Sequence, residues 1–338
     1  MTNQVQATIA ALLVRGKGIL AADETAPTTE TRFREFNLIS TPEIRRDYRE
    51  MLFTTARLNN FISGIIMVDE TVRQRTAAGV PIPEALAERG IIAGVNVDKG
   101  TVSLAACPGE DMTEGLDGLR ARLNEYCELG ISFTKWRAVI KIGPDLPTRT
   151  CIEMNARALA LFAALSQEAG LVPIVEPDIL MQGNHSIARC EEVACTTLQS
   201  VFEALADHRV ILEQMLIKTG MILPGTECLP SPDVAVVAQA TLRCFRRAVP
   251  AAIPGIMFLS GGQSPTDATE RLNAICQAGV PWRLSFSFSR GLQALVLMTW
   301  KGISNNVPAA QAALYHRARC NSAAIQGEYS SEMEQSSD

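Results

Sequence analysis

Short apolar runs recur along this chain, separated by longer stretches in which apolar and polar residues mix. Each run is mostly aliphatic or aromatic and is followed by polar residues or glycine. Continuous apolar character over so few residues is typical of parallel strands that are covered on both faces. The pattern predicts strands at 18–23, 64–69, 94–98, 133–136, 172–176, 215–218, 256–259 and 284–288.

Helical patterns fill the intervals between these runs. Residues 149–169 are rich in Ala and Leu, and Gly170 follows at the position where a helix usually ends. Thr41, Ser231 and Ser264 each precede a proline. A hydroxyl side chain caps the first turn of a helix and proline suits its first residue, so these three residues predict helix starts.

Strands that alternate with helices in this way predict an α/β fold, a (β/α)8 TIM barrel. An open, doubly wound sheet is the alternative. It more often shows a Gly-x-Gly-x-x-Gly turn after an early strand, which this chain lacks. No linker or internal repeat divides the sequence. We therefore expect one domain at 1–326 and a flexible, Ser- and Glu-rich tail at 327–338.

The composition argues against several classes of protein. With 338 residues, 47% of them hydrophobic, the chain is long enough for a large core. Its net charge is -5 and it has no long basic block, so we expect no nucleic acid partner. We also expect no membrane association, since no apolar stretch is long enough for a bilayer and the N-terminus lacks the features of a signal peptide. Nine scattered cysteines without a Cys-x-x-Cys pair indicate reduced thiols in a cytoplasmic protein.

Histidines offer little for metal binding. The chain has three, His185, His208 and His316, and none has metal-ligand spacing to another histidine. We therefore predict chemistry that needs no metal and no cofactor.

Two lysines interrupt the predicted strands, Lys218 in an apolar run and Lys135 in another. Lysine is almost never fully buried without a partner or a function. Burial disfavours an ammonium ion, and a neutral lysine can attack a carbonyl carbon to form a Schiff base. The two positions therefore predict carbonyl chemistry.

Further charged residues follow the same strands. Residues two apart on a strand share a face, so Lys135 lies beside Arg137 and Glu176 beside Asp178. In a TIM barrel, the carboxyl ends of the strands carry the active site. Interleaved carboxylates and cations there suit proton transfer beside a Schiff base. For a single carboxylate such as Asp178, a structural ion pair is the more common role.

A phosphate site is predicted after the last two strands. Loops after strands seven and eight are the recurrent phosphate site of this fold, and paired glycines let backbone N–H groups approach an anion. The candidate residues are Ser260, Gly261, Gly262, Ser287, Ser289 and Arg290.

A second anion site is a weaker hypothesis. Thr25, Thr28, Arg32 and Lys99 follow the first and third strands and could hold another phosphate. A helix cap within a solvated loop is an equally good interpretation of their spacing.

Several of these segments resemble class I fructose-1,6-bisphosphate aldolases. The similarity runs in order from about residue 10 to residue 329 and includes Gly-Ile-Leu-Ala-Ala-Asp-Glu at 18–24 and Leu-Ser-Gly-Gly-Gln-Ser at 259–264. The other matching segments are 97–100, 135–137, 172–177 and 314–327.

The resemblance implies a metal-independent lyase of glycolysis and gluconeogenesis. It cleaves fructose 1,6-bisphosphate to dihydroxyacetone phosphate and glyceraldehyde 3-phosphate. Lys218 resembles the Schiff-base lysine, Glu176 the acid/base of carbinolamine formation and dehydration, and Asp23 the base for carbon–carbon cleavage. Lys135 resembles their electrostatic helper, and Asp178 occupies a position where the family usually has glutamate.

The same resemblance assigns the phosphates and the assembly. Residues similar to the C1-phosphate site are Ser260, Gly261, Ser289 and Arg290. Residues similar to the C6-phosphate side are Thr25, Thr28, Arg32, Lys99 and Arg137. A cytoplasmic homotetramer is implied, and an aldolase that prefers another sugar bisphosphate, such as sedoheptulose 1,7-bisphosphate, is the alternative.

Two departures from the family pattern stand out. Ser289 replaces a glycine next to the phosphate. The animal enzymes end in a tyrosine that assists proton transfer, whereas the last tyrosine here is Tyr329.

Overall fold

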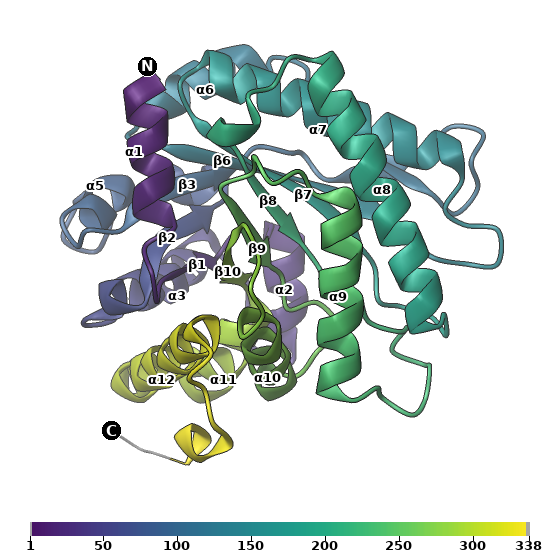
Figure 1. Ribbon diagram of the computed structural model, residues 1–338. Coiled ribbons are helices and arrows are strands. Elements are labelled where there is room, and N and C mark those ends of the chain that lie inside the picture. Colours follow the sequence, from purple (N-terminus) through teal and green to yellow (C-terminus); the bar gives the residue numbers. More distant parts are fainter. Residues whose placement is uncertain (1, 336–338) are drawn as a thin grey trace.

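A closed barrel of parallel strands forms the centre of the molecule, in the order β1-β10-β9-β8-β7-β6-β3-β2 (Figure 1). The computed structural model describes residues 2–335. It confirms the predicted TIM barrel and each of the predicted strands, with small differences at their ends. The barrel strands are β1 (Gly18–Ala21), β2 (Ile62–Met67), β3 (Ile92–Asn96), β6 (Phe133–Ile140), β7 (Val172–Ile179), β8 (Leu216–Thr219), β9 (Gly255–Phe258) and β10 (Arg283–Phe288).

Helices surround the barrel (Figure 1). They are α1 (Thr2–Leu12), α2 (Ala26–Arg34), α3 (Pro42–Phe53), α4 (Asp69–Val72), α5 (Ile82–Ala87), α6 (Leu119–Glu128), α7 (Arg149–Glu168), α8 (Ile187–Asp207), α9 (Val234–Ala248), α10 (Pro265–Cys276), α11 (Arg290–Trp300) and α12 (Val307–Gln326). Short 3-10 turns are η1 (Leu58–Asn60), η2 (Leu212–Gln214), η3 (Ser304–Asn306) and η4 (Ser331–Glu334). None of these helices is long and apolar enough to cross a membrane, within the residues described.

The barrel interior and the layer between strands and helices are separate hydrophobic cores. The interior core contains Phe133 of β6, Ile174 of β7 and Leu216 of β8. Val5 and Ile9 of α1 pack into the same core, so α1 covers the amino-terminal end of the barrel. The other core joins the outward side chains of the strands to the surrounding helices.

Further along the strands, the inward-facing rows change from apolar to charged. On β6 the row that begins with Phe133 continues two residues later with Lys135, and on β8 Leu216 is followed by Lys218. On β7, Ile174 is followed by Glu176. Apolar packing thus fills the amino-terminal half of the barrel, and charged groups gather at its carboxyl end.

An antiparallel hairpin follows β3 and was not predicted. Its strands are β4 (Thr101–Ser103) and β5 (Asp111–Thr113), and it lies outside the barrel sheet. Thr113 Oγ1 donates to the Arg137 carbonyl at 2.7 Å, which ties the hairpin to β6. The strands are short and carry mixed polar residues, so the sequence has no apolar run to reveal them.

Two of the three predicted helix starts are correct. Thr41 accepts a hydrogen bond from the Ile44 amide, and Ser264 accepts one from the Asp267 amide. The prediction at Ser231 is wrong, because α9 begins at Val234. The Ser231 hydroxyl instead accepts a hydrogen bond from Arg271 Nη2 at 3.1 Å.

The expected tail at 327–338 lies partly outside the described residues, since 336–338 are not among them. Its described part packs against the barrel helices. Tyr329 is buried, and its backbone amide donates to Asn273 Oδ1 at 3.1 Å. Glu334 forms an ion pair with Arg317 of α12 at 2.5 Å. The division of the chain into a 1–326 domain and a separate tail stays a prediction.

We predict that Gly94→Ala destabilises the barrel. A Cβ at Gly94 would lie 2.2 Å from Cζ of Phe133, whose ring fills the barrel interior. Such overpacking typically costs about 1–3 kcal/mol in the free energy of unfolding, measured by urea denaturation. Gly279→Ala is the control, because a Cβ there meets nothing within 4 Å. The double variant Gly94→Ala/Phe133→Leu should recover part of the loss, and a failure to do so would contradict this explanation.

Candidate active site

A cavity of about 670 Å³ opens at the carboxyl end of the barrel. All the site residues predicted from the sequence line it, except Lys99 and Gly262. The predicted residues that line the cavity are Asp23, Thr25, Thr28, Arg32, Lys135, Arg137, Glu176, Asp178, Lys218, Ser260, Gly261, Ser287, Ser289 and Arg290.

Lys135 stands at the centre of the charged groups. Its Nζ lies 2.7 Å from Asp23 Oδ2, 3.3 Å from Glu176 Oε2 and 3.8 Å from Asp98 Oδ2. Burial alone would lower the pKa of Lys135, but the three carboxylates outweigh it and raise the pKa, so the ammonium group stays charged. Burial would likewise raise the pKa of Asp23. Lys135 and Lys218 outweigh that effect and lower it.

Lys218 shares Glu176 with Lys135. Its Nζ lies 3.2 Å from Glu176 Oε1, while the other carboxylate oxygen faces Lys135. The side chain of Lys218 is only 5% exposed, so the amine is reached through the cavity. A primary amine, an adjacent carboxylate and a fixed cation are thus held together on β6, β7 and β8.

Asp178 is paired with Arg137. The guanidinium donates to Asp178 Oδ2 from Nε at 2.7 Å, and Nη2 lies 2.5 Å from the same oxygen. Burial raises the pKa of Asp178, although Arg137 opposes the change. Arg137 lies beside the cavity and is itself 43% exposed in its side chain. Asp178 therefore orients a cation at the cavity wall.

A network around Glu24 was missed by the sequence reasoning. Its Oε1 accepts hydrogen bonds from Arg32 Nη1 at 2.6 Å, from Gln293 Nε2 at 3.0 Å and from the Ser289 hydroxyl. Arg32 also donates to Ser289 Oγ at 3.3 Å from both terminal nitrogens. Residues from β1, α2 and α11 are thereby joined at one edge of the cavity, and Arg32 lies next to the predicted C1-phosphate residue Ser289.

The guanidinium of Arg290 is not part of this network. Among residues 2–335 no hydrogen bond or ion pair is formed by its guanidinium, although it lines the cavity. Burial and the nearby charges of Arg32 and Arg137 lower its pKa, and the charge of Asp178 opposes them only in part. Such a group is suited to an anionic ligand.

Serine hydroxyls surround this arginine. Ser260 Oγ accepts from the Gly291 amide at 3.2 Å, at the first turn of α11. Ser287 Oγ is buried without a hydrogen-bond partner among the described residues, and it also lines the cavity. A buried hydroxyl without a partner is rare, and one in the cavity lining is suited to bind a ligand.

The amino terminus of α2 provides the other anion-binding feature. Thr25 is its N-cap residue, and its hydroxyl lies 3.1 Å from that of Thr28. The hydroxyl makes no capping hydrogen bond, so the first amide groups of α2 remain available.

Two predicted residues lie elsewhere. Lys99 is exposed in the turn before β4, and its amide donates to the Glu114 carbonyl at 2.8 Å. Gly262 has a φ of +73°, and a Cβ there would lie 2.8 Å from Cβ of Met181. Gly262 therefore serves the turn and its packing, while Gly261 reaches the cavity.

The cavity lining contains no histidine and no cysteine. Its central carboxylates, Asp23, Glu176 and Asp178, each contact a lysine or arginine. Lysine and arginine side chains thus balance the charge of these carboxylates.

Comparisons with known proteins agree with this geometry. The family model described as "Glycolytic: Fructose-bisphosphate aldolase class-I" matches residues 4–338. The chain belongs to the class I fructose-bisphosphate aldolase family.

Relatives cover nearly its whole length. A Xylella fastidiosa (strain Temecula1) protein named "Probable fructose-bisphosphate aldolase class 1" is 49% identical over 97% of this chain and 98% of its own. The Dictyostelium discoideum "Fructose-bisphosphate aldolase" is 46% identical over 98% and 94%. A solved structure of the Plasmodium falciparum aldolase, in complex with TRAP and a small-molecule inhibitor, has a TM-score of 0.95 and 44% identity, covering 97% of this chain and 95% of that one.

Ser289 stands where the aldolase family usually has glycine, and its side chain forms hydrogen bonds that a glycine could not form. Its φ is -100°, a conformation that does not require glycine. Its hydroxyl forms hydrogen bonds with Glu24 and Arg32, so the serine holds the edge of the cavity together.

Gln293, one turn further along α11, was also not predicted from the sequence. A polar residue on the buried face of a mostly apolar helix is the signal that could have revealed it.

We predict that Lys135→Met destabilises this aldolase strongly at neutral pH. Removing one partner of a buried ion pair leaves uncompensated carboxylates and costs about 3–5 kcal/mol in the free energy of unfolding. The pKa of Asp23 is lowered in the folded protein, so its contribution is present at pH above its ordinary value of 3.8 and is lost as the pH falls through the folded value. The difference between variant and wild type should therefore shrink towards acid pH.

The control is Arg149→Ala, which removes an exposed pair with Glu153 and should cost less than about 1 kcal/mol. Urea denaturation across a pH series measures both variants. A loss for Lys135→Met that stays constant with pH would mean that packing, and not charge, is responsible.

Proposed function

We propose that this protein is a Schiff-base aldolase that cleaves fructose 1,6-bisphosphate to dihydroxyacetone phosphate and glyceraldehyde 3-phosphate, reversibly and without a metal. The observation that carries this proposal is the buried Nζ of Lys218, 3.2 Å from Glu176 Oε1, inside a cavity that also contains an unpaired arginine. Family membership supports the same reaction.

Covalent catalysis begins at Lys218. Its neutral amine attacks the C2 carbonyl carbon, and Glu176 is close enough to accept the proton that Nζ gives up. The C2 oxygen takes up a proton from water in the cavity, and hydrolysis of the final iminium returns that proton to solvent. The resulting carbinolamine carries a hydroxyl group on C2. Glu176 returns the proton to that hydroxyl, which leaves as water, and an iminium ion remains on Lys218.

Carbon–carbon cleavage then uses the iminium as an electron sink. Asp23 accepts the proton of the C4 hydroxyl, the C3–C4 bonding electrons move into the iminium, and C4 becomes the aldehyde of the first product. Lys135 keeps Asp23 ionised, as the lowered pKa of Asp23 indicates. The enamine left on Lys218 takes up a proton at C3, and water hydrolyses the new iminium to release the second product.

The phosphate groups supply binding energy away from the bond that breaks. Arg290, Ser260, Gly261, Ser287 and Ser289 are the proposed surroundings of the C1 phosphate. For the C6 side we propose the amino terminus of α2 with Thr25 and Thr28, together with Arg137 held by Asp178. Arg32, which the resemblance assigns to the C6 side, contacts Ser289 of the proposed C1 surroundings, and this contact supports a role for Arg32 beside both phosphates.

A cytoplasmic homotetramer is part of this proposal. The Pisum sativum relative, 48% identical over 93% of this chain, is named as a cytoplasmic isozyme. Light scattering coupled to size exclusion tests the tetramer directly.

We predict that borohydride traps dihydroxyacetone phosphate on Lys218. Loss of water and reduction of the iminium should add the mass of dihydroxyacetone phosphate less one oxygen atom to the peptide that contains Lys218, as read by mass spectrometry, and EDTA should not prevent it. Lys218→Arg should abolish labelling, whereas Lys301→Arg, a change at an exposed lysine, should leave it intact. Labelling at Lys135 would refute the assignment, and a dependence on added zinc would refute the metal-free mechanism.

We predict that Arg290→Ala weakens use of the C1 phosphate. The loss of a charge-assisted, bidentate contact should cost about 2–3 kcal/mol of transition-state binding, which is about 30- to 160-fold in kcat/KM for fructose 1,6-bisphosphate. The effect on fructose 6-phosphate, which lacks the C1 phosphate, should be much smaller. Arg283→Ala, at the opposite end of β10, is the control. An equal fall for both substrates would mean that Arg290 supports the structure or the chemistry instead.

A further inference from the structure

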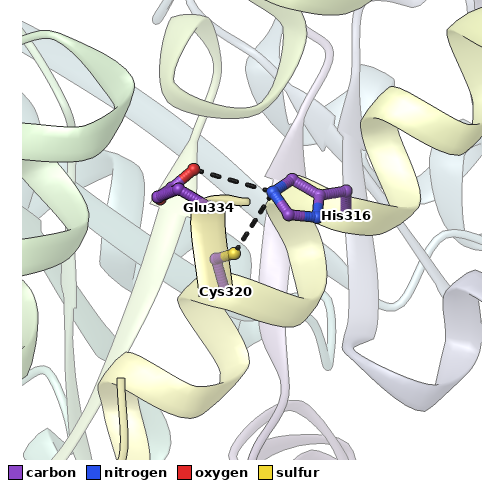
Figure 2. A group of neighbouring side chains, drawn as sticks. All are labelled: His316, Cys320 and Glu334. Atoms are coloured by element: carbon purple, nitrogen blue, oxygen red, sulfur yellow. Dashed lines mark hydrogen bonds and ion pairs between the residues drawn. The ribbon is translucent and has the colours of Figure 1, made fainter. Parts of the chain in front are cut away.

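A second group of chemically active side chains lies at the carboxyl end of the chain (Figure 2). His316 and Cys320 are four residues apart on α12 and therefore share one face of the helix. Glu334 reaches the same point from η4. His316 Nε2 lies 3.7 Å from Cys320 Sγ and 3.6 Å from Glu334 Oε2, and the three ligand atoms all lie within 4.8 Å of one another.

We propose that His316, Cys320 and Glu334 bind a zinc ion that fastens the segment 331–334 to α12. The proposal concerns a structural metal outside the barrel cavity, and none of its ligands belongs to the aldolase site. Two ligands come from α12 and one from the tail, so the ion connects two elements that are otherwise held by side-chain contacts alone.

The distances fit tetrahedral zinc. Zinc binds histidine nitrogen and carboxylate oxygen at about 2.0–2.2 Å and thiolate sulfur at about 2.3 Å, which places neighbouring ligand atoms about 3.3–3.6 Å apart. The observed separations of 3.6 and 3.7 Å around His316 Nε2 are within a few tenths of an ångström of that geometry. The same separations are those of weak direct contacts, a sulfur hydrogen bond and an ion pair, which zinc coordination would replace.

The donor set favours zinc over other common cations. Magnesium and calcium prefer oxygen ligands, whereas one imidazole, one thiolate and one carboxylate form a mixed set of intermediate softness. On binding, the Cys320 thiol releases its proton to solvent and His316 binds as the neutral imidazole through Nε2. The ion's two charges are then balanced by the thiolate and the Glu334 carboxylate.

Neighbouring groups already hold Glu334 in place. Its Oε1 accepts from the Tyr329 hydroxyl at 2.8 Å and from Arg317 Nη1 at 2.5 Å, and Arg317 Nη1 also lies 2.6 Å from Oε2. A carboxylate oxygen has two lone pairs, so Oε2 can accept from Arg317 and still bind a metal. Arg317 is itself anchored by a hydrogen bond to the Pro265 carbonyl at 3.0 Å. Such outer contacts orient metal ligands and tune affinity.

The burial of the ligands allows entry and one further ligand. Cys320 is fully buried, while the side chains of His316 and Glu334 are 23% and 24% exposed. The site is therefore open to solvent on the side of His316 and Glu334. A water molecule can complete the tetrahedron from that side.

The test uses the full-length protein, stripped with EDTA, and zinc or cobalt ions as the probe. Calorimetry should detect one zinc ion per chain, and cobalt should give the near-ultraviolet charge-transfer band of a cobalt–thiolate bond. Cys320→Ser and Glu334→Gln should each weaken zinc binding at least tenfold. Tyr329→Phe, which removes an outer contact of Glu334, should weaken it about 10- to 100-fold. With zinc bound, glutamyl endopeptidase should cut after Glu332 and Glu334 more slowly.

Matched controls separate this site from others. Cys127→Ser changes an exposed thiol and His208→Gln another histidine, and both should leave zinc binding unchanged. Glu334 lies near the surface, so Glu334→Gln keeps the test valid if Cys320→Ser impairs folding. Binding that is absent, or that survives both Cys320→Ser and Glu334→Gln, would overturn the proposal. None of these measurements uses aldolase activity, so a negative result for zinc would not count against the proposed aldolase reaction.

Discussion

The buried charge of Lys135 is the constraint on which the carboxyl end of the barrel depends. Moving an ammonium ion out of water is costly unless carboxylates surround it in good geometry. Here Asp23 follows β1, Asp98 follows β3 and Glu176 lies on β7, and all three reach the same nitrogen. No local segment brings these groups together, so the charge is compensated only when the barrel closes. The interaction that prepares the site for catalysis therefore also requires the fold.

The same arrangement explains why two lysines in one cavity have different tasks. Lys135 is held as a cation by three carboxylates, and its charge lowers the pKa of Asp23. Among residues 2–335, Lys218 forms an ion pair with Glu176 alone, and the second oxygen of Glu176 lies close to Lys135. One lysine is thus a fixed charge, and the other has a single carboxylate within reach to exchange its proton. The register of β6, β7 and β8 brings both lysines to Glu176. Lys135 lies opposite Ile174, two residues before Glu176, and the residue before Lys218, Ile217, lies opposite Val175, the residue before Glu176.

The barrel and its central residues could be predicted from the sequence because both leave strong local signals. Apolar runs indicate the strands, and a charged residue such as Lys218 within an apolar run is unusual enough to indicate a function. The alternation of side chains along a strand then places Lys135 with Arg137 and Glu176 with Asp178. These inferences need only the period of a strand and the common direction of parallel strands.

Other features depend on contacts between distant residues and leave no such signal. Glu24, Arg32, Ser289 and Gln293 are separated by most of the chain, and each is an ordinary polar residue in its own segment. Lys99 follows a strand as the pattern predicts, but it is exposed in the turn before β4 and is not part of the cavity lining. The convergence of His316 and Cys320 on Glu334 was not predicted, because a single histidine and a single cysteine four residues apart are a weak signal and the third residue comes from a segment without periodicity.

Tyr329, the last tyrosine of the chain, is held outside the barrel cavity by its packing. The Tyr329 hydroxyl donates to Glu334, and its backbone amide is bonded to Asn273, so the residue is part of the packing between the tail and α10. A side chain held in this way does not deliver a proton inside the barrel. Within the described residues, the carboxylate that forms an ion pair with Lys218 is Glu176. In the mechanism that we propose, the enamine would therefore receive its proton at C3 inside the barrel cavity, from Glu176 of β7 or from water that enters there.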